Sequence, residues 1–205
     1  MNGQQSIKTI NSIEALKVIF FVIIGVSITS SLEKLTVILP ESRTISNLLF
    51  NFSLLIKDQF LLFIAFMATL VRFCLGVVCI LDKHENKPRI IILVTYIFFI
   101  LIACSFFAMG LNVDNADMFA VSLIFLLVFD LAWIIIDLIN RKLNNLQIEK
   151  SMYQWIKSNI AIFVVLGIFF VFRLPLPLSN YLFIIAILAA VWDFISNHEF
   201  YFSIT

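Results

Sequence analysis

Long runs of apolar residues, separated by short charged or proline-containing stretches, set the pattern of this chain. A helix needs about 20 mostly apolar residues to cross the hydrocarbon core of a bilayer. Six runs approach that length, so the pattern predicts an all-α, polytopic membrane bundle of six transmembrane helices. Four helices are the alternative count, since the fifth run has only about fifteen clean apolar residues after Asn159. The predicted spans are residues 16–35, 54–81, 89–109, 117–140, 155–173 and 178–200.

The connections between these runs are short. The longest two, residues 36–53 and 141–154, cannot enclose a core of their own, so residues 1–205 are expected to form a single transmembrane domain with no extramembrane domain. An alternative for the first run is a secretory signal, with Lys8 and Lys17 as its basic region and a cleavage site near Ser27.

Lys and Arg residues are divided unequally between the two sides of such a bundle. Basic residues concentrate in the cytoplasmic loops of membrane proteins. We therefore expect both termini in the cytoplasm and the chain in an inner, cytoplasmic membrane. Nine basic residues fall on the cytoplasmic side, namely Lys8, Lys17, Lys83, Lys87, Arg89, Arg141, Lys142, Lys150 and Lys157, and four on the other side, namely Lys34, Arg43, Lys57 and Arg173.

The composition agrees with a lipid environment. Of the 205 residues 62% are apolar and 13% are charged, whereas soluble domains average about 45–50% and about 25%. The net charge is only +1 and the 14 Lys and Arg residues are scattered, which excludes a nucleic-acid-binding surface. The three cysteines form no Cys-x-x-Cys pair and are expected to be packing residues.

Three charged residues lie inside the predicted spans: Arg72, Asp130 and Asp193. Each costs roughly 2.5–3.5 kcal/mol on insertion scales, so each needs a partner or a wet cavity. Arg72 lies ten residues before Asp82 and Asp130 eleven before Arg141, which places both at a matching depth of about 15 Å. The simplest arrangement is an Arg72–Asp130 pair with Asp193 as a second acceptor for the guanidinium. Such a network either fixes helix register or serves as a polar pathway or a charge pair that a signal breaks.

Small and polar residues accompany these charges at helical spacing. Thr69 and Gly76 share the face of Arg72, and Asn197 shares the face of Asp193; small residues let helices approach closely. The first span carries a second polar cluster, which either contacts a neighbouring helix or lines a pore. Its members are Ser27, Ser30, Ser31 and Glu33.

The basic segment 141–150 is a candidate contact for anionic lipid or for a cytoplasmic partner protein, through Arg141, Lys142 and Lys150. Its apolar residues Leu143 and Leu146 also allow a short interfacial helix. The alternative is a solvated linker.

None of the common catalytic sets is present in the sequence. The two histidines, His84 and His198, lie in a loop and near a helix end, which does not suit haem ligation or a His-based zinc site. We therefore expect no cofactor, no metal and no enzymatic activity. An aspartic protease built on Asp130 and Asp193 is the least favoured hypothesis, because Arg72 at a similar depth would keep both carboxylates ionised.

These observations favour a non-enzymatic, oligomeric inner-membrane protein that acts as a channel-like or membrane-sensing subunit. The chain has almost no soluble mass, which suggests a cytoplasmic partner, as in bacterial stress or phage-defence (antiviral) systems. Its richness in Ile, Asn, Lys and Phe is typical of an AT-rich bacterial gene. The alternative is a small secondary transporter that couples to protons through Asp130 or Asp193.

Overall fold

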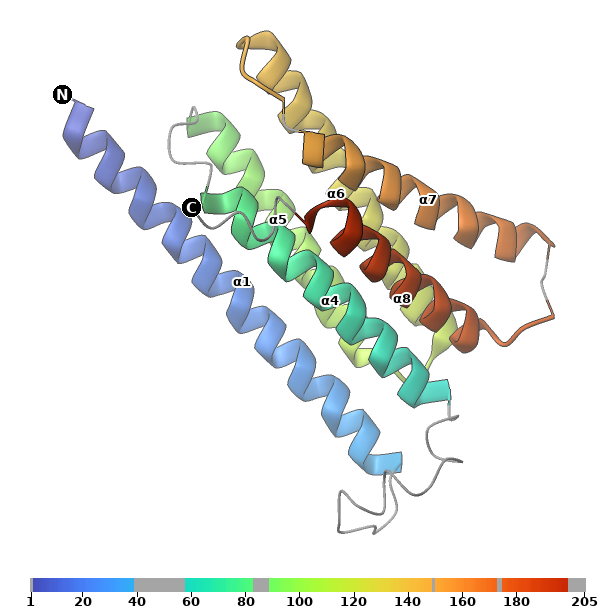
Figure 1. Cartoon of the computed structure of the whole chain (residues 1–205). Coiled ribbons are helices and arrows are strands. Elements are labelled where there is room, and N and C mark those ends of the chain that lie inside the picture. The colour runs from blue at the N-terminus through green and yellow to red at the C-terminus, as the bar shows by residue number, and fades with distance from the viewer. Residues whose placement is uncertain (1, 39–57, 83–88, 149, 173–174, 199–205) are drawn as a thin grey trace.

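The computed structural model of the chain describes residues 2–38, 58–82, 89–148, 150–172 and 175–198 (Figure 1). Within these ranges every regular element is an α-helix. The helices are α1 (Asn2–Ile38), α4 (Asp58–Asp82), α5 (Arg89–Leu111), α6 (Ala116–Leu143), α7 (Lys150–Phe172) and α8 (Leu178–Ser196).

Six helices of the described part are long and apolar enough to cross a bilayer, which confirms the six-helix membrane bundle. Two helices begin earlier than predicted. Helix α7 begins at Lys150 rather than at Trp155, because its first turn is polar but still helical. Helix α1 likewise begins at Asn2, well before its apolar window of Glu14–Leu35. The predicted span residues 54–57, 173 and 199–200 lie outside the described residues.

The helices are not packed equally. Helix α4 packs most extensively on α8, α5 packs on both α6 and α1, and α7 makes fewer contacts, with α8 and α6. Figure 1 shows α1 and α7 at opposite flanks of the bundle, with α4, α5, α6 and α8 between them. Of these two flanking helices, α1 is attached mainly through α5, and α7 through α8 and α6.

Aromatic rings fill much of the core between α4, α5 and α6. The rings of Phe73 and Phe106 meet edge to face at 5.5 Å between centroids, and those of Phe99 and Trp133 meet in the same way at 5.3 Å. Edge-to-face pairs of this kind add about 0.5–1.5 kcal/mol to the stabilisation that burial provides. Trp133 is thus a packing residue, and its Nε1 also donates to Thr95 Oγ1 at 3.4 Å.

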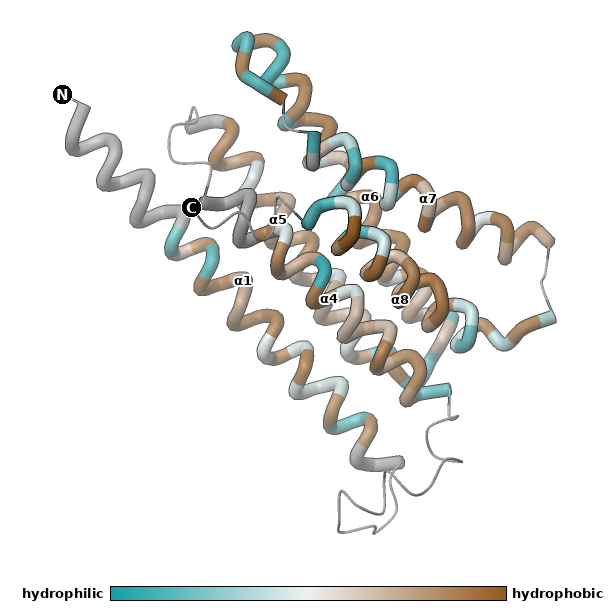
Figure 2. Tube along the Cα trace, in the orientation of Figure 1, coloured by the Kyte–Doolittle hydropathy of each residue, from teal (hydrophilic) through white to brown (hydrophobic). Residues whose placement is uncertain are grey.

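The middle stretches of the helices are mostly apolar (Figure 2), and many of their large apolar side chains are exposed. Val18, Ile195 and Val171 are examples, the last of them 75% exposed. A soluble protein does not leave such an apolar surface bare. The exposed apolar surface therefore faces lipid.

Polar contacts join the helix ends on the side opposite to residues 141–150. Lys34 near the end of α1 pairs with Asp114 at 2.6 Å, and Ser179 in the first turn of α8 donates to Asp58 in the first turn of α4 at 2.6 Å. Nearer the middle of α1, the backbone of Ser27 lies close to α5: a Cβ added at Gly110 of α5 would lie 2.5 Å from the Ser27 carbonyl oxygen. Glycine at this position lets α5 approach the backbone of α1.

The basic segment after α6 does not form a separate interfacial helix over residues 144–148. Helix α6 runs to Leu143, and Asn145 then adopts a positive φ of 51°, a conformation that Asn tolerates better than most residues. Asp137 pairs with Arg141 at 2.9 Å, and Arg141 Nη1 also donates to the Gln147 carbonyl at 3.0 Å. Arg141 thereby ties the turn back to the end of α6.

Candidate functional site

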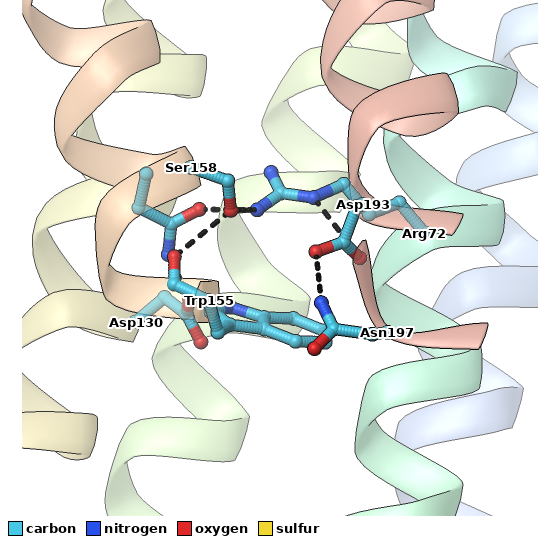
Figure 3. Close-up of polar contacts among 7 residues, drawn as sticks. Arg72, Asp130, Trp155, Ser158, Asp193 and Asn197 are labelled. Atoms are coloured by element: carbon cyan, nitrogen blue, oxygen red, sulfur yellow. Dashed lines mark hydrogen bonds and ion pairs between the residues drawn. The ribbon is translucent and has the colours of Figure 1, made fainter. Parts of the chain in front are cut away.

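Arg72 is the centre of a buried polar network between α4, α6, α7 and α8. Its side chain is only 2% exposed. One terminal nitrogen, Nη2, donates to Ser158 Oγ at 2.7 Å and to Asn159 Oδ1 at 2.6 Å, both on α7. Figure 3 shows the guanidinium reaching from α4 toward Ser158 and Asp193. Arg72 therefore connects α4 to α7 directly.

Asp193 is the ion-pair partner of Arg72. Its Oδ2 lies 3.6 Å from Arg72 Nε, and both side chains are buried. The other oxygen, Oδ1, accepts from Asn197 Nδ2 at 2.9 Å, one turn farther along α8 (Figure 3). Asn197 thus orients the carboxylate that neutralises the guanidinium.

Asp130 on α6 receives its hydrogen bonds from α7. Its Oδ2 accepts from Trp155 Nε1 at 2.6 Å and from Asn159 Nδ2. The side chain is 3% exposed. Two donors on one carboxylate oxygen hold Asp130 against α7 without a direct bond to Arg72.

The order of partners differs from the expectation of a direct Arg72–Asp130 pair with Asp193 as second acceptor. The ion pair joins Arg72 to Asp193, and the amide of Asn159 lies between Arg72 and Asp130, accepting from one and donating to the other. Depth alone led to the expected pair. The structure differs because α8 packs along α4 and brings Asp193 to the guanidinium first.

Gly76 makes room for the indole ring that reaches Asp130. A Cβ at this position would lie 1.7 Å from Cη2 of Trp155. The indole also lies edge-on to Phe73 and 5.3 Å from the Arg72 guanidinium carbon, within the range of a cation–π contact. The small residue predicted on the face of Arg72 therefore serves one specific ring.

Two cavities lie beside the network. One has a volume of about 10 Å³ and is lined by Thr69, Arg72, Ile162 and Ala186 among others, which is room for about one water molecule. The other is an open apolar groove of about 460 Å³ between α7 and α8. Its lining is Ser158, Ala161, Ile162, Val165, Ile185, Leu188, Ala189 and Trp192. Ser158 thus touches both the groove and Arg72.

The other polar residues predicted in the spans lie at helix contacts or on the surface. Thr69 is buried and donates to the Ala65 carbonyl. Ser27 and Ser31 are buried and donate to carbonyls of α1 itself, so they act as helix-contact residues in this protomer. Ser30 is half-buried and Glu33 is exposed.

The three basic candidates near the α6–α7 turn are not brought together with the buried network. Arg141 is bound by Asp137 and Gln147, whereas Lys142 and Lys150 are exposed. Of the cysteines, Cys74 is half-buried against the core, Cys104 is exposed, and the side chain of Cys79 lies outside the described ones.

Sequence reasoning missed the contribution of α7. Its buried residues are Trp155, Ser158, Asn159, Ile162 and Leu166. They lie at positions i, i+3, i+4, i+7 and i+11, which is the pattern of one helix face. The polar residues Ser158 and Asn159 on this face could have indicated a buried contact. In the sequence analysis, Asn159 served only to mark where the shorter apolar stretch of the fifth run begins.

Comparisons of the chain with family models, curated proteins and solved structures give no match. Among the described residues, no group of three or more His, Cys, Asp or Glu side chains could hold a metal ion.

Proposed function

We propose that the chain is a non-enzymatic membrane-sensing subunit in which α7 is the element that responds. The observation that carries the proposal is the way α7 is attached. Four hydrogen bonds, between Trp155, Ser158 and Asn159 on one side and Arg72 and Asp130 on the other, join its inner half to the bundle. Its outer half has two buried residues, Ile162 and Leu166, and contacts α8 through Tyr181.

The strength of this attachment suits an element with two positions. Intramembrane polar contacts average about 0.6 kcal/mol each, so four contribute roughly 2–3 kcal/mol. A gap of a few kcal/mol leaves a minor state populated at about 0.1–10%. A change in the bilayer that favours the displaced position of α7 would therefore alter its population measurably.

The proposal also covers the location, the assembly and the partner of the subunit. The subunit would lie in a bacterial inner membrane with both termini in the cytoplasm, assemble with copies of itself, and pass the displacement of α7 to a cytoplasmic partner through Lys142 and Lys150. A role in stress or phage defence fits such a subunit. If the assembly is channel-like, the pore would form between protomers, because the pockets beside the network are a cavity of about 10 Å³ and an apolar groove.

The test measures the distance between α7 and α6 in different bilayers. Spin labels are placed at Val171 on α7 and Phe125 on α6, both exposed to lipid, in a chain whose three cysteines are replaced by alanine. Vesicles of short-chain and long-chain lipids are compared by double electron–electron resonance. The proposal predicts two distances whose ratio changes with chain length, whereas one distance in every bilayer would refute it.

A proton-coupled transporter is the second candidate, favoured by the excess of carboxylates in the network. The guanidinium of Arg72 pairs with Asp193. Asp130 instead accepts its hydrogen bonds from the neutral donors Trp155 and Asn159. A cavity large enough for about one water lies beside Arg72. This candidate predicts proton-driven uptake of labelled amino acids or sugars into vesicles that saturates and is lost in Asp130→Asn. Uptake that is absent, or equal in the variant, would count against it.

A further inference from the structure

A contact between α7 and α8 bounds the groove toward the outer ends of the two helices, and the groove is open toward the inner end. Toward the outer end of α7, Tyr181 of α8 donates to the Val165 carbonyl at 2.6 Å and its ring lies 4.4 Å from that of Phe169. Toward the inner end, Trp192 lines the groove and is 62% exposed. An occupant therefore enters from the lipid or from the inner side.

The groove has room for a hydrocarbon chain. Its α7 wall runs from Ser158 to Val165, which is about 10 Å at 1.5 Å per residue. Its space of about 460 Å³ is lined by apolar side chains and by Ser158. The acyl chain of a lipid is linear and apolar, so it suits this lining.

A positive charge continues the wall of the groove toward the cytoplasmic side. Lys157, Ala161 and Val165 are separated by four residues each, so they lie on one stripe of α7. Ala161 and Val165 line the groove, and Lys157 is exposed one turn closer to the inner end. The long side chain of lysine can reach the headgroup region from such a position. The groove thus offers an apolar wall for a chain and a cation for a headgroup.

We propose that the α7–α8 groove binds one anionic phospholipid of the inner leaflet, with an acyl chain between the helices and its phosphate at Lys157. Ser158 both lines the groove and accepts a hydrogen bond from Arg72. Occupancy by the chain therefore touches the contact that holds α7 in place. This inference names the ligand class of the proposed sensing site and rests on that function only for its consequence, not for the binding itself.

Quenching of tryptophan fluorescence by lipids with brominated acyl chains tests the proposal. Trp192 lies in the groove, whereas Trp133 and Trp155 are buried in the bundle. The protein is reconstituted with increasing fractions of brominated phosphatidylglycerol or brominated phosphatidylcholine. The part of the quenching that disappears in Trp192→Phe comes from Trp192 and therefore measures lipid in the groove. We expect it to saturate with the anionic lipid at about fivefold lower content, as one lysine near the surface contributes about 1 kcal/mol.

Two pairs of variants locate the binding. Lys157→Gln should remove the anionic preference, whereas Lys142→Gln, which removes an exposed charge at the end of α6, should keep it. Ala161→Phe should fill the groove and abolish the saturable quenching, whereas Val164→Phe, at an exposed position of α7 outside the groove, should not. Equal quenching by both lipids that Ala161→Phe leaves unchanged would mean ordinary annular lipid and would overturn the proposal.

The two proposals can fail separately. If lipid binds but the α6–α7 distance is the same in every bilayer, the site stands and the sensing function falls. If that distance changes with bilayer thickness but the groove shows no anionic preference, the function stands and the lipid site falls.

Discussion

The indole ring of Trp155 on α7 occupies the space that a side chain at Gly76 on α4 would fill, and the polar network depends on this packing. The indole lies where a side chain at position 76 would project, and from there its N–H reaches Asp130. The packing of a single ring therefore sets the position of a buried carboxylate.

Gly76→Ala should destabilise the protein by about 2–4 kcal/mol, since it adds overpacking of about 1–3 kcal/mol and weakens a hydrogen bond of about 0.5–1.5 kcal/mol. Unfolding of the detergent-solubilised protein by a denaturing detergent measures this change. Gly167→Ala is the matched control, because nothing lies within 4 Å of a Cβ at that position. A loss in Gly167→Ala equal to that in Gly76→Ala would contradict the packing argument.

The identity of the ion pair leads to a second residue-scale prediction. Breaking a buried pair by removing one partner costs about 3–5 kcal/mol, whereas replacing both partners with apolar residues is often neutral. Arg72→Leu should therefore be rescued better by Asp193→Leu than by Asp130→Leu, because Arg72 pairs with Asp193. Folded yield from membranes measures the rescue, and better rescue by Asp130→Leu would show that the pair was assigned to the wrong carboxylate.

At the scale of the element, the sequence predicts the helices better than their lateral order. Continuous apolar runs locate the six spanning helices of the described residues, and the face of Leu123, Leu126 and Asp130 on α6 is buried as its spacing implies. Depth along a helix follows from counting residues, but which neighbour is met at that depth depends on packing. This is why Asp193 rather than Asp130 pairs with Arg72, and why Asn159 was missed.

The close approach of α1 and α5 gives a prediction about a whole element. Gly110→Ala would place a Cβ 2.5 Å from the backbone oxygen of Ser27, so α1 has to shift. We expect a loss of about 1–3 kcal/mol from overpacking, measured by the same unfolding assay. Gly25→Ala on α1, with nothing within 4 Å of the added carbon, should be nearly neutral; an equal loss in both variants would exclude a specific contact.

At the scale of the whole molecule, the bundle combines a well-packed part with a loosely attached flank. Helices α4, α5 and α6 share aromatic packing and α8 packs extensively on α4, whereas α7 makes fewer contacts, through the polar bonds of its inner half and the Tyr181 contact of its outer half. Orientation belongs to this scale too. Reporter fusions at both termini should report from the cytoplasm, because the basic residues concentrate on that side, and a C-terminus that reports from outside would refute the topology.

The central claim is that the polar network holds α7 to the bundle, and Asn159→Leu tests it most directly. Leucine is close in size to asparagine but removes the bonds to both Arg72 and Asp130. With the spin labels at positions 171 and 125, the account predicts that the longer of the two α6–α7 distances is more populated than in the parent protein in the same bilayer, in a variant that still elutes as a folded protein. A folded variant with the same distance distribution as the parent protein would contradict it.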